Sequence, residues 1–425
     1  MTCWTIAYSM KLGFIVICYL SGKRILIRMI SRLVVGIFLL DTGISSATAD
    51  QFDTVSYIAR TGISFDDNLF RLSPDADPKS VIGQSSKSEE IRFSTLGIHL
   101  NKGYSNQKFI LNADVTSNQY NTFSFLDYNS TVYKAAWNWS FTPWVTGVLG
   151  SDHSQTLNDF ANTRTFVRNL NTVDTNHLNA DWWFQSNWHV LFGGSQTQST
   201  STVTTINNLG YLTKSGEAGL KYFPDGGRSI SLITRRIEGN YIDVLPGYAA
   251  ILDNGYTEWQ DELQFNWQFS GKSTLSGNVM YIDHRYPFSF QRDYSGIQAG
   301  LTYTWSISGL TLLNISLNRK ISPWWDSASN YYVTDTVSVS PSWQLSSKIL
   351  VYMSINNVTS DFLSPAVPNA STRYDLNQTE QIGVDWTPQR SVTVSATIQH
   401  SLGSSNLSSF NYDYNTMSLS AQLAF

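Results

Sequence analysis

Histidine, serine and acidic side chains are the groups of this chain that could carry out catalysis, and their spacing matches no common catalytic motif. The 425-residue sequence contains no G-x-S-x-G elbow, no P-loop and no H-E-x-x-H pair. Its six histidines lack the spacing of metal ligands. Gly193-Gly194-Ser195 is the one segment with some likeness to a nucleophile turn, and His177 or His189 would be its partner base. An ordinary strand suits that segment better, so the sequence predicts no enzyme, no metal and no cofactor.

Charged residues that recur at every second position are the stronger candidates for a functional site. If they face an enclosed, water-filled bore, their excess of carboxylates favours neutral or cationic solutes, because charged rings set the sign of permeant ions. One alternative stays open, in which half of the carboxylates pair with bases on neighbouring strands, such as Arg235 or Arg236. The candidate lining residues are Asp114, Lys134, Asp181, Glu217, Lys221, Glu258, Glu262, Asp375 and Asp385.

The elements that must position these residues are strands with a period of two. Between residues 256 and 269, Trp259, Leu263, Phe265, Trp267 and Phe269 fall on one face, and Glu, Gln and Asn residues fall on the other. A strand separates these two sets completely, whereas a helix would scatter them around its circumference. No convincing amphipathic helix follows Asp50.

Turn residues divide the chain into about eighteen such strands, joined alternately by short turns and longer loops. Gly, Pro, Asn, Asp and Ser occupy the short connections, at Asn101-Lys102-Gly103 and Ser186-Asn187 for example. The expected spans are 54–65, 91–100, 107–118, 129–141, 144–153, 174–185, 188–198, 212–223, 228–240, 256–269, 274–285, 294–306, 310–320, 331–344, 349–360, 374–387, 391–402 and 412–425.

Strand length selects the architecture. A propeller would place four short strands in each period of about 40 residues, whereas a transmembrane barrel places two long ones there. A soluble sandwich would need a second layer to cover the rings, and the chain offers none. The predicted fold class is therefore all-β, a transmembrane antiparallel β-barrel of the outer-membrane type with about 18 strands (16–18).

Ring placement and the last strand agree with a barrel in the bacterial outer membrane. Tryptophans cluster beside the short turns, as expected for a girdle at the level of the lipid headgroups. The chain ends in an alternating strand whose final residue is Phe425. This ending is similar to the terminal signal that the barrel-insertion machinery reads in outer-membrane proteins. The girdle candidates are Trp137, Trp139, Trp144, Trp267 and Trp386.

The first 49 residues differ in kind and are expected to be a signal peptide, with Met29 as a possible true start. Arg32 precedes the apolar run from Leu33 to Leu40, and Ala47-Thr48-Ala49 follows as a cleavage site. The alternative is a transmembrane anchor over 13–40, which four basic residues interrupt. Residues 50–425 then form a single barrel domain.

Charge and composition exclude other classes of protein. Five of the 28 basic residues and one of the 32 acidic residues lie in the leader, so residues 50–425 carry a net charge near −8. A nucleic-acid partner would require a basic surface, so none is expected. Both cysteines also lie in the leader, so the exported chain must fold without disulfides.

The segment from Tyr57 to Leu72, which contains Asp66-Asp67-Asn68-Leu69-Phe70-Arg71, carries a family resemblance. It resembles the opening of the outer-membrane barrels of the EpsL type, encoded with exosortase-associated exopolysaccharide operons. Asn162-Thr163-Arg164 and the region from Asn179 to Trp188 are compatible with that family. The resemblance implies a barrel that assists polysaccharide export, with polysaccharide and a periplasmic polysaccharide co-polymerase as partners. It carries over no catalytic residue.

Two interpretations of that segment remain. Asp66, Asp67, Asn68 and Arg71 either form a turn that leads into a long loop, or form a polar knot that contacts sugar hydroxyls or folds a loop inward as a constriction. The sequence as a whole predicts a passive conduit or accessory for exopolysaccharide export in the outer membrane, in contact with the lipid bilayer. The alternatives are a general or sugar-selective porin, and a structural or adhesive barrel without transport.

Overall fold

The computed structural model describes residues 54–205, 207–224, 227–244, 253–324, 329–364 and 372–425. The predicted leader, including Met29 and the expected start at Asp50, lies outside the described residues. Over the described ranges, no helix is long and apolar enough to cross a membrane.

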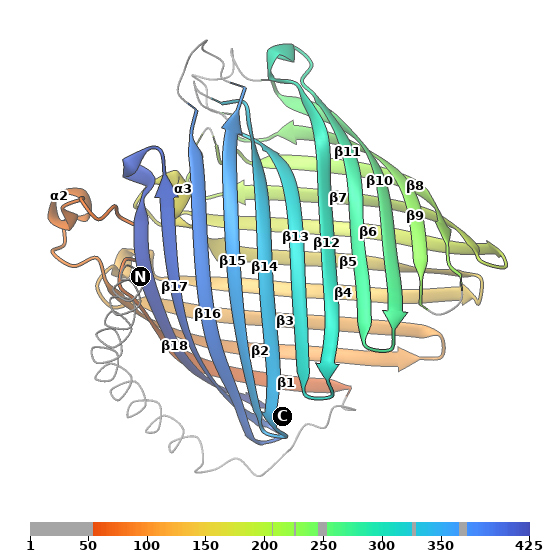
Figure 1. The fold of residues 1–425 in the computed structure, drawn as a ribbon, viewed down its shortest axis with the longest axis horizontal. Helices are drawn as coiled ribbons and strands as arrows, with labels where there is room; N and C mark the ends of the chain where they lie inside the picture. Colours follow the sequence, from red (N-terminus) through yellow and green to blue (C-terminus); the bar gives the residue numbers. More distant parts are fainter. Residues whose placement is uncertain (1–53, 206, 225–226, 245–252, 325–328, 365–371) are drawn as a thin grey trace, which may run out of the picture.

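Within the described part of the chain, eighteen antiparallel strands form one closed barrel, and the upright strands β12 to β18 lie in front of β1 to β9 in Figure 1. Their bounds are β1 Val55–Asp66, β2 Glu89–Tyr104, β3 Gln107–Tyr120, β4 Tyr128–Thr142, β5 Val145–Leu157, β6 Leu170–Gln185, β7 Trp188–Ser201, β8 Tyr211–Tyr222 and β9 Ser229–Tyr241. The second half comprises β10 Gly255–Ser270, β11 Ser273–Arg285, β12 Tyr294–Ser308, β13 Thr311–Pro323, β14 Tyr331–Ser346, β15 Ile349–Leu363, β16 Tyr374–Gln389, β17 Val392–Ser405 and β18 Tyr412–Ala424. The predicted fold class is confirmed.

The barrel closes between its first and last strands. β1 pairs with both β2 and β18. At the seam, the Tyr57 amide donates to the Phe425 carbonyl (2.7 Å) and the Phe425 amide donates to the Tyr57 carbonyl (3.0 Å). The two rings are stacked, with centroids 5.9 Å apart. The C-terminal residue therefore completes the wall, which leaves no unpaired sheet edge.

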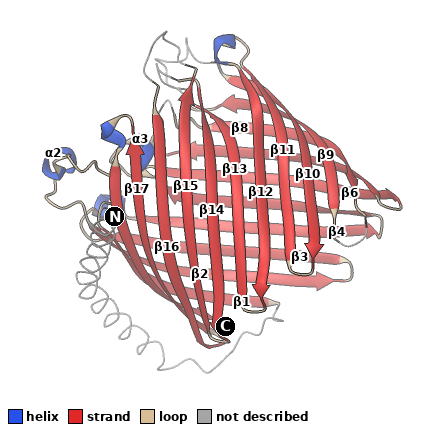
Figure 2. Cartoon of the chain, viewed as in Figure 1, coloured by secondary structure: helices blue, strands red, loops and turns tan. Residues whose placement is uncertain are grey.

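The two ends of the barrel differ as the sequence predicts. One end carries the short turns. The other carries longer loops with all the described helical elements, as Figure 2 shows. These elements are α2 Pro78–Ile82, α3 Phe160–Thr163, η1 Ser124–Leu126, η2 Phe290–Arg292 and η3 Ser408–Phe410. Outer-membrane barrels have short periplasmic turns and longer extracellular loops, so the loop end is the extracellular mouth.

One predicted turn is wrong. The sequence places a turn at Asn101-Lys102-Gly103, but β2 continues to Tyr104 and the turn is Ser105-Asn106. Ser105 adopts a left-handed conformation with φ of 54°. The expected glycine is not needed, because a serine in a two-residue turn can adopt this conformation at modest cost.

The outer face of the wall is apolar. On β10, Trp259 and Leu263 are exposed, whereas Gln260 and Glu262, which alternate with them, are buried. The strand registers carry this division around the barrel, because directly paired residues share a face. Exposed apolar residues occupy the outer face on most strands, among them Leu96, Val115, Leu149, Phe192, Leu232, Ile297, Leu317, Val337, Ile382 and Ile398.

A closed wall with an apolar exterior satisfies every requirement for contact with lipid, since each strand finds its backbone partners within the barrel. Trp144 and Trp386, which are 53% and 48% exposed, lie at or near the short turns. They match an aromatic girdle at the periplasmic rim. The chain is a bacterial outer-membrane β-barrel.

The loop end is stabilised by carboxylates that accept hydrogen bonds from backbone amides of a neighbouring loop. Glu89, which is 1% exposed, accepts from the amides of Thr122 and Phe123, directly before η1. Asp253 accepts from the amides of Phe288 and Ser289, directly before η2. In both places, a carboxylate that binds two consecutive backbone amides holds the neighbouring loop in position at the end of the barrel.

Candidate functional site: the lumen wall and the extracellular mouth

Two regions contain the candidate functional residues, the inner face of the wall and the mouth. The strand registers place all nine predicted lining residues on the inner face. Most of them form ion pairs with side chains of adjacent strands, and these pairs gather on the wall from β6 to β11.

Asp181 on β6 is the centre of the first group. Its carboxylate lies 2.5 Å from His189 Nδ1 on β7 and 3.3 Å from Lys221 Nζ on β8. All three side chains are partly exposed to the bore. A carboxylate with two basic neighbours offers little uncompensated charge to a passing ion.

Arg235 on β9 organises the second group. Its Nη2 lies 2.6 Å from the Glu217 carboxylate on β8 and 3.7 Å from Glu262 on β10. Its Nη1 donates to the Gln260 side-chain oxygen at 2.6 Å. Arg236, the next residue, points outward and pairs with Glu238 on its own strand at 2.9 Å. Of the two bases that the sequence left open, only Arg235 neutralises the lumen wall.

Glu258 continues this wall toward the mouth. Its carboxylate lies 2.7 Å from His284 Nδ1 and accepts from the Gln260 amide at 2.5 Å. The His284 imidazole is 2% exposed, between the stacked rings of Tyr256 and Tyr294 at centroid distances of 4.3 and 4.6 Å. Aromatic side chains therefore fill the upper bore on this side.

The remaining predicted lining residues are less connected. Asp114 lies 3.3 Å from His99, and Asp375 forms a buried pair with Arg373 at 2.5 Å. Lys134 is in register with Asp152 on β5. Asp385 lies in register with Ser395 on β17.

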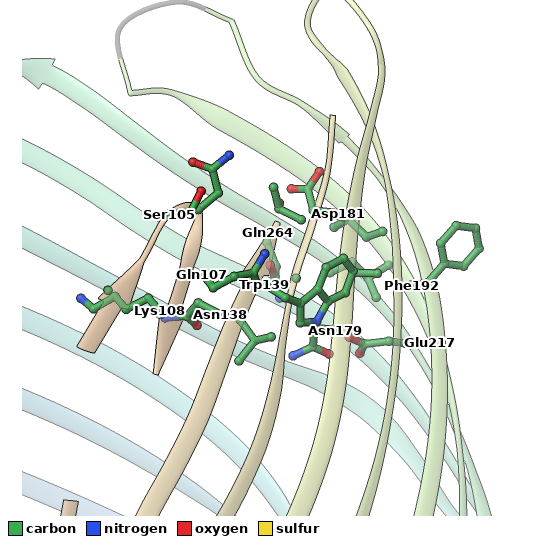
Figure 3. Close-up of a pocket in the computed structure, with 18 of the residues that line it drawn as sticks. Ser105, Gln107, Lys108, Asn138, Trp139, Asn179, Asp181, Phe192, Glu217 and Gln264 are labelled. Atoms are coloured by element: carbon green, nitrogen blue, oxygen red, sulfur yellow. The ribbon is translucent and has the colours of Figure 1, made fainter. Parts of the chain in front are cut away.

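A cavity of about 810 Å³ lies beside the first two groups, toward the periplasmic end (Figure 3). Amide and acidic side chains from five strands line it, among them Gln107, Asn138, Asn179, Asp181, Glu217 and Gln264. Phe192, in contrast, points away from the others in Figure 3. The cavity is a recess in the wall whose lining combines apolar side chains, such as Leu191 and Ile233, with the hydrogen-bonding groups that a hydroxylated solute requires.

Trp139, one of the predicted girdle residues, is 8% exposed and lines the cavity. Its indole lies over Gly147 on β5, where an added Cβ would come within 2.3 Å of Trp139 Cζ2. The absence of a side chain at Gly147 makes room for the indole, so the ring packs against the wall.

The other side of the bore, from β14 to β18, carries few charged side chains on its inward face apart from Asp375 and Asp385 on β16. The inward residues of β14 run Tyr332, Thr334, Thr336, Ser338, Ser340, Ser342 and Gln344. The inward residues of β17 and β18 are likewise Ser, Thr, Gln, Gly and Tyr. The bore therefore has one wall of charged groups that contact one another and one wall of mainly hydroxyl and amide groups.

At the mouth, the predicted polar knot exists and is satisfied internally. Arg71 Nη1 donates to both Asp66 carboxylate oxygens, at 2.9 and 2.8 Å, and its guanidinium lies 3.4 Å from the Tyr414 ring centroid. The Asn68 side chain donates a hydrogen bond to the Leu72 carbonyl and accepts one from the Leu72 amide. Asp67 accepts from the amide and the side chain of Asn415 on β18. These residues fold the loop and offer few free groups to a solute.

The knot anchors a hydrophobic cluster that covers one side of the mouth. Phe70 is 1% exposed and makes edge contacts with Phe123 and Phe160 at 4.8 and 4.7 Å. The cluster draws on the loops after β1, β3 and β5, and its buried members are Leu69, Phe70, Leu72, Tyr120, Phe123, Leu126 and Phe160. Residues 69–72 therefore pack against the loops after β3 and β5.

The weak catalytic candidate has no catalytic geometry. The Ser195 hydroxyl is hydrogen-bonded to the Ser215 hydroxyl at 2.7 Å, and His189 is bonded to Asp181. His177 lies opposite Ser195 in register, but its ring covers Gly150 on the other neighbouring strand. Among the described residues, no group of three or more His, Cys, Asp or Glu side chains could hold a metal ion.

Comparisons with known proteins yield similar folds. No family model and no curated sequence matches this chain. OpdK of Pseudomonas aeruginosa with vanillate is similar at 10% identity and a TM-score of 0.48, over 87% of this chain and 99% of that one. A BenF-like porin from Pseudomonas fluorescens gives 10% identity and 0.49, over 88% and 99%. OccK2 (OpdF) of P. aeruginosa in complex with glucuronate gives 10% and 0.47, over 88% and 98%. At such identities the likeness concerns the barrel fold alone.

Proposed function

We propose that this barrel is a passive porin for small hydrophilic solutes, with neutral hydroxylated molecules such as sugars as the best fit. The observation that carries the proposal is the chemistry of the bore. One wall presents Ser, Thr and Gln side chains, and on the other wall Arg235 and Lys221 form ion pairs with carboxylates, while three histidine rings contact further carboxylates. Because most of the charged groups have partners within the wall, the bore discriminates mainly by hydrogen bonding and size.

Swelling of proteoliposomes in neutral sugars tests the proposal. Vesicles that contain the refolded chain should swell in arabinose or glucose, and more slowly in a trisaccharide. Amino acids of either net charge should enter at rates set mainly by size. A barrel that neither conducts ions nor admits any sugar would support the third class, a structural or adhesive barrel, and would overturn the proposal.

Exopolysaccharide export is the second candidate. It is supported by the resemblance in residues 57–72 and by the hydroxyl-lined wall, which suits a neutral polymer as well as a monomer. The internal satisfaction of Asp66, Asn68 and Arg71 argues against direct contact of these residues with polymer. Their role in export would be to hold the loop that narrows the mouth.

A deletion strain separates the two candidates. If the barrel assists export, loss of the gene should abolish surface polysaccharide, and a barrel that lacks 66–90 should restore export incompletely. If it is a porin alone, polysaccharide export should be normal and sugar uptake should slow. A polysaccharide co-polymerase that co-purifies with the full-length protein would further favour export.

A further inference from the structure

Arg164 is a partly buried cation, and two of its nitrogen atoms are buried without a hydrogen-bond partner. It follows α3 directly, and its Nη1 donates to the Arg71 carbonyl. The two unpartnered atoms are Nε and Nη2. Burial of donors on a charged group without an acceptor is costly. An arrangement of this kind indicates that another acceptor occupies the place when the protein functions.

The surroundings of Arg164 combine aromatic rings, a second arginine and two carboxylates, Asp159 and Asp375. The Phe410 ring centroid lies 5.2 Å from the Arg164 guanidinium and 3.5 Å from that of Arg373. Burial, and then the charge of Arg373, lower the pKa of Arg164. Arg373 donates from Nε and Nη2 to Asp375 and Asn162. The corresponding two nitrogen atoms of Arg164 have no such acceptor and could bind a further ligand.

The geometry of the free donors limits the chemical groups that could bind there. Nε and Nη2 lie on the same edge of a planar guanidinium, and this edge presents two parallel N–H groups that match two oxygens of one carboxylate or phosphate group. The backbone of Arg164 is also held in the left-handed region, with φ of 50°. A non-glycine residue in that region is a strained arrangement that often marks a functional site.

We propose that Arg164, with Arg373 beside it, forms a binding site for an oxyanion at the extracellular mouth, and that the ligand is a carboxylate or phosphate group held by the Nε and Nη2 edge. The site lies between the loop after β5, the loop before β16 and the loop before β18. A bound anion therefore links three loops across the mouth. Either an acidic solute or the phosphate of an outer-leaflet lipid could supply this group. The proposal does not depend on the porin function, because binding can be measured without transport.

Hydrogen exchange of residues 158–169 measures the binding locally. The folded chain in a neutral detergent is titrated with sodium phosphate or sodium acetate at constant ionic strength against chloride. We expect saturable protection of this segment, with at least a threefold slower exchange at saturation. In a second arm, nanodiscs of neutral lipid are compared with nanodiscs that contain anionic lipid. Protection by soluble anions indicates a solute ligand, and protection by anionic lipid alone indicates a lipid phosphate.

Three variants make the test specific. Arg164→Gln removes the charge and should raise the half-saturating anion concentration at least tenfold. Arg164→Lys keeps the charge without the two-donor edge and should raise it several-fold, so it serves if Arg164→Gln fails to fold. Arg168→Gln is the matched control, because Arg168 lies in the same loop, is exposed and donates to the Asp127 carbonyl. Its anion response should equal that of the unmodified chain.

Two results would overturn the proposal. One is exchange of residues 158–169 that is independent of phosphate, acetate and anionic lipid in the unmodified protein. The other is protection that survives unchanged in folded Arg164→Gln and Arg164→Lys proteins, since the anion would then bind elsewhere.

Discussion

Replacement of Arg235 by glutamine should make the channel markedly more selective for cations. Arg235 lies between Glu217 and Glu262 and is the cation that both carboxylates contact. Glutamine keeps a hydrogen-bonding side chain of similar length, so the change removes a positive charge and leaves two carboxylates on the wall. A passing cation is then attracted more strongly and a passing anion is repelled more strongly.

The size of the effect follows from Coulomb's law. A unit charge about 7 Å from the path of a hydrated ion contributes about 0.6 kcal/mol in water. Screening at 0.1 M salt reduces this contribution to about 0.3 kcal/mol. Because the cation gains what the anion loses, their free energies separate by about 0.6 kcal/mol, which is roughly a threefold change in the permeability ratio. At 1 M salt, where the Debye length is about 3 Å, the change should nearly vanish.

The assay is the reversal potential of single channels in a KCl gradient, at a low and a high mean concentration. Arg236→Gln is the matched control, because it removes the same charge from the adjacent residue on the outer face. It should leave the permeability ratio unchanged. Equal ratios for Arg235→Gln and the unmodified channel, or an equal shift in the Arg236→Gln control, would refute the assignment of Arg235 to the bore.

Further predictions concern the mouth and the closure of the barrel. Phe70→Ala should destabilise the loop cluster by about 3–5 kcal/mol and speed proteolysis of residues 67–88. Phe125→Ala is the control, because Phe125 is 52% exposed, and it should not change the cleavage rate. Equal cleavage rates in the two variants would contradict the packing of Phe70. Asp66→Asn should leave Arg71 without its charge partner and cost about 3–5 kcal/mol, seen as faster hydrogen exchange of residues 67–72. Asp75→Asn, at an exposed position, is its control, and unchanged exchange in Asp66→Asn would argue against the knot. Phe425→Ala should lower the yield of heat-modifiable folded barrel in cells, because Phe425 stacks on Tyr57 at the seam; a normal yield would show that closure does not need the ring.

The strands could be predicted because their signal is local. Alternation of apolar and polar residues is complete within one strand, and the requirement for an apolar outer face decides which set points outward. The segment 256–269 was expected as a strand, and β10 covers Gly255–Ser270. The turn at Ser105-Asn106 has a weaker signal than Gly103, and the glycine therefore places the predicted turn too early in the chain.

The ion pairs of the lining residues can be predicted only in part from the sequence. Arg235 and Arg236 are adjacent, so the period of two requires that one points inward and the other outward. The inward position of Ile233 and Ile237 on either side of Arg235 complicates the assignment from sequence. The register with Glu217 on β8, which decides the matter, is a property of the assembled sheet.

The side-chain contacts at the extracellular mouth are the part of the structure that the sequence predicts least. Asp66, Asn68 and Arg71 are close in sequence, so their knot was a visible hypothesis. Arg164 meets the carbonyl of Arg71, which is 93 residues earlier in the chain. Arg373 contacts Asn162 across 211 residues. No local pattern encodes such contacts, because they arise only when the barrel brings distant loops to one rim. The packing of the Trp139 indole over Gly147 likewise depends on the neighbouring strand and has no local signal.

Chemical labelling of two adjacent positions tests the division between the lipid-facing and bore-facing sides most directly. Both cysteines of the sequence lie in the first 18 residues, so Leu263→Cys and Gln264→Cys would each introduce a single thiol into residues 50–425. In a lipid bilayer, a small membrane-impermeant maleimide should modify the thiol at 264 and leave the thiol at 263 unmodified, while both react after denaturation. Rapid modification at 263 with protection at 264, or equal modification at both, would contradict a barrel with an apolar exterior and a wet bore.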